Sequence, residues 1–98
     1  MVKGRVQLRP AAELDLKQIY WYSDKKFGRD RAERYIRDLD RALQCLADDP
    51  QLGRDGSEIK PGLMIYQVVS HIVFFRIVEE GIAIIRVLHK SMDYKRHL

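Results

Sequence analysis

The chain has 98 residues, of which 46% are apolar and 33% are charged, and its formal net charge at pH 7 is +4. This composition predicts one small folded domain over residues 1–98 and excludes an intrinsically disordered chain, which combines low hydrophobicity with a large charge imbalance. No apolar run reaches the roughly 20 residues that a membrane-spanning helix needs, and the start lacks the apolar core of a signal peptide, so we expect a cytoplasmic protein with no membrane partner.

The first half of the chain is predicted to form a strand and two helices. Residues 2–8 alternate apolar and polar side chains, the period-two pattern of a strand with one solvated face. An apolar stripe over residues 10–27 predicts a helix that stops at Gly28. A second helical pattern covers residues 29–46 and ends before Pro50. Because the link between the helices is very short, we expect them to form a hairpin.

The second half is predicted to form a loop and three strands. Residues 50–62 are rich in Pro, Gly, Asp and Ser, which is typical of a loop. Residues 63–69, 72–78 and 82–88 are rich in β-branched and aromatic side chains, which favour strands. Two and three residues separate these strands, so they form an antiparallel meander. The predicted fold is α+β in the order βααβββ, with the helical hairpin packed on one face of an antiparallel sheet.

Side chains suited to metal or nucleophilic chemistry are few and poorly spaced. The three histidines show no ligand spacing, and Cys45, the single cysteine, is predicted to be a buried small hydrophobe. Ser70 and Ser91 lack the strained turn of a hydrolase nucleophile, and no glycine-rich phosphate loop is present. We therefore expect no metal and no cofactor.

A metal-free ribonuclease needs less, namely a general base, a general acid and cations beside the phosphate. The last strand and the C-terminal tail contain suitable side chains, which are Arg86, His89, Lys90 and Tyr94. An arginine inside an apolar strand also commonly extends to the solvated face, and tail residues are often simply solvated. The residues alone leave this activity open.

Five stretches of the chain, in order, resemble one bacterial protein family. They are ELDLKQIYWY, FGRDRAERYI, LADDPQLGRD, IVFFRIVEEGIAIIRVLHKSMD and the final HL. Together they are similar to the ParE branch of the RelE/ParE toxins of toxin–antitoxin pairs, over nearly the whole chain. Pro50, Gly53 and the run from Ile84 to Asp93 are the most specific parts. The resemblance implies the same βααβββ organisation as the pattern analysis.

The resemblance also separates two activities. RelE toxins cleave messenger RNA on the ribosome with basic side chains and a C-terminal tyrosine, whereas Leu63 stands here in place of a RelE arginine and Arg96 at the expected tyrosine position. A leucine cannot stabilise a phosphorane, so the ParE branch is favoured. ParE toxins inhibit DNA gyrase by trapping it on cleaved DNA, and an antitoxin whose C-terminal segment wraps the toxin neutralises them.

The resemblance therefore implies a toxin that inhibits gyrase rather than an enzyme, with DNA gyrase and a ParD-like antitoxin as its partners. A RelE-type ribonuclease and a basic binding module without activity are the alternatives. Opposite charges four residues apart on the second helix, such as Asp30 and Arg34, give its arginines a local role. We accordingly expect no sequence-specific nucleic-acid binding by the toxin alone.

Two sets of side chains are candidates for these contacts. The tail after the last strand is expected to dock on the target through Arg86, His89, Lys90, Met92, Tyr94, Lys95 and Arg96. Consecutive helical positions are turned by about 100°, so the aromatic side chains of the first helix cannot all face the core. The candidates for antitoxin binding are therefore Tyr20, Trp21, Tyr22 and Phe27. An antitoxin strand can also extend a free sheet edge, and removal of residues 94–98 is expected to spare the fold.

Overall fold

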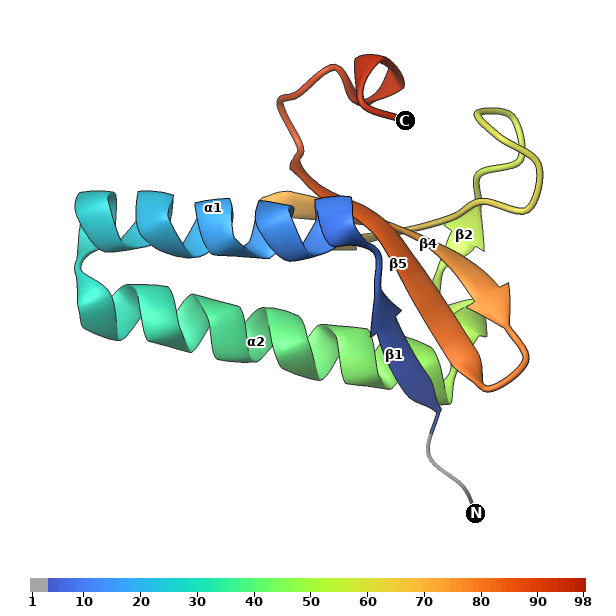
Figure 1. Cartoon of the computed structure of the whole chain (residues 1–98), viewed down its shortest axis with the longest axis horizontal. Coiled ribbons are helices and arrows are strands. Elements are labelled where there is room, and N and C mark those ends of the chain that lie inside the picture. The colour runs from blue at the N-terminus through green and yellow to red at the C-terminus, as the bar shows by residue number, and fades with distance from the viewer. Residues whose placement is uncertain (1–3) are drawn as a thin grey trace.

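The structure is a computed structural model that describes residues 4–98, and it consists of a helical hairpin packed on a five-stranded sheet (Figure 1). The elements are β1 (Arg5–Leu8), α1 (Pro10–Phe27), α2 (Arg29–Asp48), the 3₁₀ turn η1 (Pro50–Leu52), β2 (Arg54–Asp55), β3 (Met64–Val68), β4 (His71–Val78), β5 (Gly81–His89) and the 3₁₀ turn η2 (Tyr94–Arg96). This confirms the predicted α+β fold and its order. The two-residue strand β2 is added within the segment predicted as a loop.

The first strand departs from the predicted antiparallel sheet. The strand order is β1-β5-β4-β3-β2, and β1 pairs with β5 in parallel, so the sheet is mixed. A Cβ at Gly81 would lie 2.1 Å from the carbonyl oxygen of Arg5, so only glycine permits this close approach. The strands β3, β4 and β5 form the predicted antiparallel meander. Residues 2 and 3 of the predicted first strand lie outside the described part of the chain.

The helical hairpin is set by signals at the ends of its helices. Pro10 occupies the first turn of α1, Glu13 lies near its positive end, and Lys25 and Lys26 lie in its last turn, which complements the helix dipole. Gly28, with φ of 93°, separates the helices, and its N–H donates to the Asp24 carbonyl at 2.9 Å. A φ of this sign costs glycine little, so the chain reverses there.

Different parts of the chain cover the two faces of the sheet. The helices cover one face, over a core that includes Ile19, Leu39, Leu43, Phe75 and Ile84. The other face carries a smaller cluster around Phe74 and Leu88, which Ile59 of the loop covers together with Tyr94 and Leu98 of the tail. The expectation that removal of residues 94–98 spares the fold assumed that little core lies in the tail, and this assumption is wrong because Tyr94 and Leu98 pack on the second cluster.

Two further expectations about burial need correction. Cys45 is exposed rather than buried, because it lies off the apolar stripe of α2 that contains Leu43 and Leu46. Phe27 was predicted to continue the core stripe of α1, but 51% of its surface is exposed. The reason is that the end of the hairpin extends beyond the sheet (Figure 1). Over residues 4–98, no helix is both long enough and apolar enough to cross a membrane.

Candidate functional site

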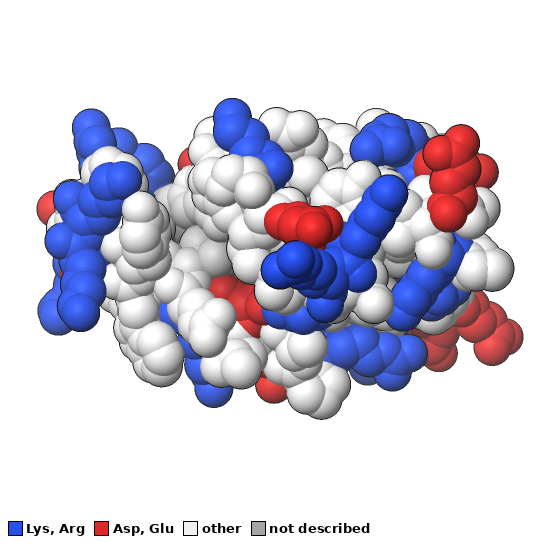
Figure 2. All heavy atoms as spheres, turned by 90° about the horizontal axis from the view of Figure 1, so that it is seen from above, with Lys and Arg blue, Asp and Glu red and all other residues white. Residues whose placement is uncertain are grey.

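A groove of about 1020 Å³ lies between the projecting end of the hairpin and the beginning of the C-terminal tail. The residues that we use to define this groove are Asp15, Tyr22, Lys26, Phe27, Arg31, Arg34, Tyr35, His71, Arg86, His89, Met92 and His97. Figure 2 looks onto this side of the molecule and shows the surface hollowed beside the Lys and Arg side chains at the end of the hairpin. The projection of α1 and α2 past the sheet thus creates the concave surface.

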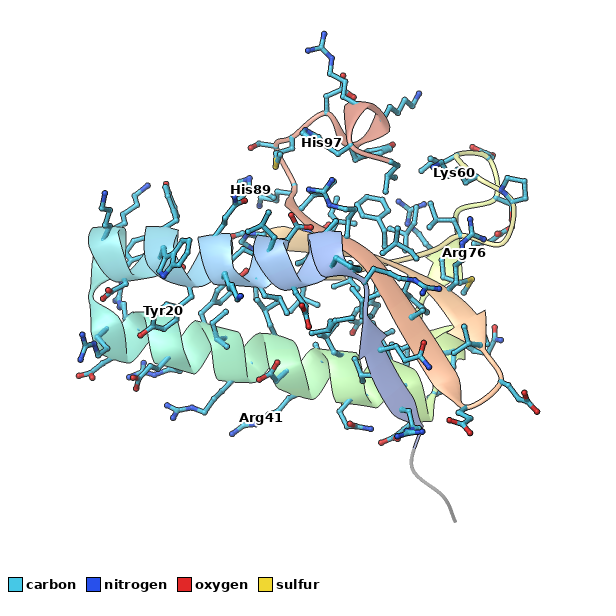
Figure 3. The ribbon with its side chains drawn as sticks, viewed as in Figure 1. Tyr20, Arg41, Lys60, Arg76, His89 and His97 are labelled. Atoms are coloured by element: carbon cyan, nitrogen blue, oxygen red, sulfur yellow. The ribbon has the colours of Figure 1, made fainter. Side chains whose placement is uncertain are left out.

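The helix geometry divides the four aromatic residues predicted to bind an antitoxin. Tyr22 and Phe27 line the groove, and 61% and 51% of their surfaces are exposed. Trp21 is 59% exposed but does not line the groove. Tyr20 is half-buried and lies on the side of α1 that faces α2 (Figure 3). The structure brings two of the four side chains to one site.

Cations accompany the aromatic side chains of this wall. The Lys26 ammonium donates to the Tyr22 hydroxyl at 3.1 Å and lies 5.4 and 5.6 Å from the ring centres of Tyr22 and Phe27. The Arg31 guanidinium lies 5.8 Å from the Phe27 ring centre. Within residues 4–98, no acidic group comes within 4.0 Å of the cations of Lys26, Arg31 or Arg34. The wall is therefore both apolar and positively charged.

An ion pair between Asp15 of α1 and Arg86 of β5 closes another side of the groove. Arg86 Nε and Nη2 each donate to a separate Asp15 oxygen at 2.8 Å, and the Val87 N–H donates to the same carboxylate at 2.9 Å. Arg86 Nη1 also donates to the His97 carbonyl at 3.1 Å. The hydrogen bonds to Asp15 raise the pKa of the Arg86 guanidinium. This guanidinium is therefore committed to contacts within the chain.

A β-bulge in β5 explains the position of Arg86. Phe75 pairs with Ile84 but Phe74 pairs with Arg86, so β5 contains one extra residue at this point. The bulge shifts the alternation of the strand, and Val87 rather than Arg86 takes the next position in the helix-side core. Asp15 was not predicted to be the partner of Arg86. The sequence did contain a signal for this pair, because Asp15 lies between apolar positions of α1 and Arg86 lies in an apolar strand.

Two histidines and a tyrosine form a polar cluster at the floor of the groove. The Tyr35 hydroxyl is 2.6 Å from His71 Nδ1, and the His71 and His89 rings meet edge to face with centres 5.3 Å apart. Burial lowers the pKa of His71 to about 4; repulsion from His89 adds to this and Asp15 opposes it. Burial also raises the pKa of the Tyr35 hydroxyl. Among residues 4–98, no group of three or more His, Cys, Asp or Glu side chains is placed to hold a metal ion.

The structure separates the seven residues predicted to dock on the target. Arg86, His89 and Met92 line the groove. Tyr94 packs on Phe74 with ring centres 5.5 Å apart. The remaining three, Lys90, Lys95 and Arg96, are exposed cations on the tail, and Arg96 makes an exposed contact of 3.5 Å with Asp93. Leu63, which the resemblance placed at the position of a RelE arginine, is buried in the cluster on the second face of the sheet.

Known proteins resemble this chain over almost its full length. It is 39% identical over 98 residues to toxin ParE1 of Mycobacterium tuberculosis, with 99% of this chain and 100% of the relative covered. It is 35% identical over 92 residues to toxin ParE1 of Caulobacter vibrioides, with 94% and 95% covered. A solved structure of a chromosomal ParDE toxin–antitoxin system from P. aeruginosa has the same fold, with a TM-score of 0.76 at 19% identity over 89% of this chain and 96% of that one.

The family comparison agrees with these relatives. Residues 6–94 match the family described as the ParE toxin of the type II toxin–antitoxin system parDE. The match includes α1, α2 and all five strands except the first residue of β1. The resemblance stated from the sequence is therefore confirmed, and the chain belongs to the ParE toxin family of type II toxin–antitoxin systems.

Proposed function

We propose that this ParE toxin inhibits DNA gyrase without hydrolysing RNA, and that a ParD-like antitoxin neutralises it by occupying the groove with its C-terminal segment. Family membership supports the first part, and the Asp15–Arg86 ion pair is the observation in the fold that carries it. A ribonuclease of the RelE type needs cations that are free to stabilise a phosphorane. Arg86, the only arginine among the ribonuclease candidates of the last strand and the tail, instead donates two hydrogen bonds to a carboxylate of its own chain.

Two further observations count against a ribonuclease. Leu63 is buried and apolar where a RelE toxin has an arginine. His71 Nδ1 is engaged by Tyr35, and the low pKa of this imidazole keeps it neutral near pH 7. A neutral imidazole can accept a proton but cannot serve as the protonated acid of an acid–base pair. We therefore assign the toxic action to binding rather than to bond cleavage.

The groove has the properties expected of a site for an antitoxin segment. An amphipathic segment can bury the exposed faces of Tyr22 and Phe27, each worth about 1–2 kcal/mol when partly buried. Acidic side chains on the same segment can pair with Lys26 and Arg31, whose cations have no acidic group within 4.0 Å among residues 4–98. The partner is thus an acidic amphipathic segment, laid into a groove as in other helix-in-groove complexes. The strand order also leaves β1 and β2 at the sheet edges, where a partner strand can add.

The tail supplies the proposed contact with gyrase or its DNA. Tyr94 anchors η2 on the sheet, while Lys90, Lys95 and Arg96 stay exposed around it. Exposed cations of this kind attract anionic partners over a distance set by the ionic strength. We expect this contact to form in the cytoplasm, where gyrase acts on the chromosome.

Purified toxin and gyrase test the proposal directly. Supercoiling should fall and cleaved DNA should accumulate as toxin is added, and prior addition of the antitoxin should prevent both effects. Messages should stay intact in a translation reaction that contains the toxin. Ribosome-dependent cleavage of a message at defined codons, with gyrase unaffected, would overturn the proposal in favour of the RelE-type activity.

A further inference from the structure

His71 and His89 come together because β4 and β5 are paired at their ends. His71 is the first residue of β4 and pairs with His89, the last residue of β5. Their rings are nearly perpendicular, at 89°, and 5.3 Å apart. His89 lies where β5 leads into the tail (Figure 3). Both histidines line the groove, so a ligand in the groove passes over this pair.

The hydrogen bonds of each ring define which nitrogen carries the proton. The Tyr35 hydroxyl is 2.6 Å from His71 Nδ1, and we assign the phenol O–H as the donor because it is a stronger acid than a neutral imidazole N–H. The Ser91 N–H donates to His89 Nδ1 at 3.1 Å. An imidazole that accepts at Nδ1 carries its proton on Nε2 when it is neutral. Each ring therefore has a donor at Nε2.

Both Nε2 donors belong to rings that line the groove. Neither has a hydrogen-bond partner among residues 4–98. No buried side-chain nitrogen or oxygen in this part of the chain lacks a partner. The Nε2 atom of the partly buried His71 must therefore be accessible to solvent, and the His89 residue is itself exposed. Tyr35 and Ser91 hold the Nδ1 sides of the two rings. The two neighbouring Nε2 donors are therefore preorganised for an acceptor.

The groups around His71 include no free carboxylate that could stabilise a positive charge on its imidazole. Asp15 of α1 faces it, but this carboxylate is already paired with Arg86 of β5. Tyr35 of α2 is neutral, and repulsion between the two imidazoles disfavours the protonated form of His71. Burial and His89 together keep the pKa of His71 at about 4. An acidic group brought in by a ligand would supply the missing charge.

We propose that His71 and His89 form a binding point for one carboxylate of the acidic antitoxin segment, an assignment that rests on the proposed use of the groove. The carboxylate accepts hydrogen bonds from the two Nε2 donors. Because a bound carboxylate favours the protonated imidazole, the pKa of His71 is higher in the complex than in the free toxin. We therefore expect the affinity to increase as the pH falls from 7.5 towards 5.5, with uptake of a proton on binding.

Two variants of His71 distinguish the effect of its Nε2–H donor from the effect of its positive charge when protonated. His71→Asn keeps an acceptor close to the Nδ1 position for Tyr35 and removes the outer donor. His71→Gln keeps an N–H group near the Nε2 position but cannot be protonated. His97→Gln is the matched control, because His97 also lines the groove but is separate from the pair. If a His71 variant does not fold, as judged by its melting transition, His89→Asn provides the same comparison.

The probe is a synthetic peptide with the C-terminal sequence of the antitoxin encoded beside this toxin. In companion peptides, each Asp or Glu is replaced singly by its amide. His71→Asn should weaken binding about tenfold or more, the loss of a hydrogen bond to a charged group. At one acidic position of the peptide, replacement by the amide should weaken binding to the wild-type toxin. The same replacement should weaken binding to His71→Asn little further, because the two groups interact with each other. His71→Gln should reduce the pH dependence to what His89 alone contributes, and His97→Gln should leave it in place.

Each remaining outcome has a distinct meaning. A peptide that binds the wild type equally at pH 5.5 and 7.5, with no acidic position coupled to either histidine, would overturn the carboxylate site and leave the groove assignment intact. A peptide whose affinity is unchanged by Phe27→Ala would overturn the groove assignment, and the carboxylate site with it. Gyrase inhibition by the free toxin is measured separately, so these failures stay distinguishable from a failure of the gyrase proposal.

Discussion

Asp15 and Arg86, which are 71 positions apart in the sequence, form a two-bond ion pair that joins α1, β5 and the C-terminal tail. Their side chains are 7% and 22% exposed. Asp15 accepts three hydrogen bonds and Arg86 donates three, so the pair is well satisfied. A satisfied buried pair contributes little net stability, but removal of one partner leaves an uncompensated charge. Asp15 and Arg86 therefore position the groove and the tail.

Asp15→Asn should destabilise the toxin by about 3 kcal/mol, because it leaves the Arg86 charge largely buried without its counter-ion. Urea denaturation of the two proteins measures the difference. The matched control is Asp93→Asn, whose partner Arg96 is exposed; an exposed pair is worth less than about 1 kcal/mol. Equal stability losses for the two variants would contradict the assignment of Asp15 as a structural anchor.

The tail should separate into an anchor and a charged surface. Deletion of residues 94–98 should cost about 2–4 kcal/mol, because it uncovers Phe74 and the rest of the second cluster. Replacing Lys90, Lys95 and Arg96 together by Ala should change the free energy of unfolding by less than about 1 kcal/mol. The triple variant should nevertheless inhibit gyrase less and depend less on salt. A triple variant that keeps its fold and its full potency would show that the tail cations do not contact the target.

The groove aromatics should matter more for antitoxin binding than Trp21. Phe27→Ala and Tyr22→Ala should each weaken the antitoxin complex by about tenfold or more, since they remove aromatic area at a desolvated contact. Trp21→Ala is the control, because Trp21 is equally exposed but lies outside the groove. Isothermal titration with the antitoxin gives the three affinities. A larger loss for Trp21→Ala than for Phe27→Ala would place the antitoxin on a different face of α1.

The helical hairpin and the meander could be predicted because their signals are local. Apolar spacing, Gly28 and the short links between strands act within a few residues. The parallel pairing of β1 was missed, because it depends on the approach of Arg5 to Gly81 across the chain. The β-bulge that aims Arg86 at Asp15 was missed for the same reason, since an extra residue in β5 leaves no trace in its composition.

The candidate site was predicted in part. The aromatic composition of α1 indicated a binding surface, but only the projection of the hairpin decides that Tyr22 and Phe27 face the groove. The tail was identified from its charge, whereas its packing on the sheet through Tyr94 needs the three-dimensional structure. The pairing of His71 with His89 follows from the strand register, which the hairpin length alone did not fix.

The buried histidine predicts how stability depends on pH. The pKa of His71 is about 4 in the folded chain and 6.5 for an unperturbed histidine. Between these values the unfolded chain binds more protons than the folded chain, so stability is present above pH 6.5 and is lost as the pH falls towards 4. The slope for this group is at most about 1.4 kcal/mol per pH unit. His71→Asn should flatten the stability curve in this interval, and His97→Gln should not.

The turn between β3 and β4 carries a strained residue that can be relieved. Val69 has φ of 53° and is 68% exposed. A β-branched side chain disfavours this left-handed conformation by about 1–2 kcal/mol, whereas asparagine adopts it more readily and avoids the extra backbone entropy of glycine. Because Val69 buries little surface, Val69→Asn should raise the free energy of unfolding by about 1 kcal/mol.

Val69→Ala is the control for this substitution, because it removes the branched side chain but keeps a Cβ that also disfavours positive φ. Denaturant titration should rank the variants with Asn above Ala, and both with unchanged slopes against denaturant concentration. The turn holds His71 and Ser70 beside the groove, so the antitoxin affinity of Val69→Asn should match that of the wild type if the backbone is preserved. A stability below that of the wild type would mean that the side chain of Val69 contributes more than its strained backbone costs.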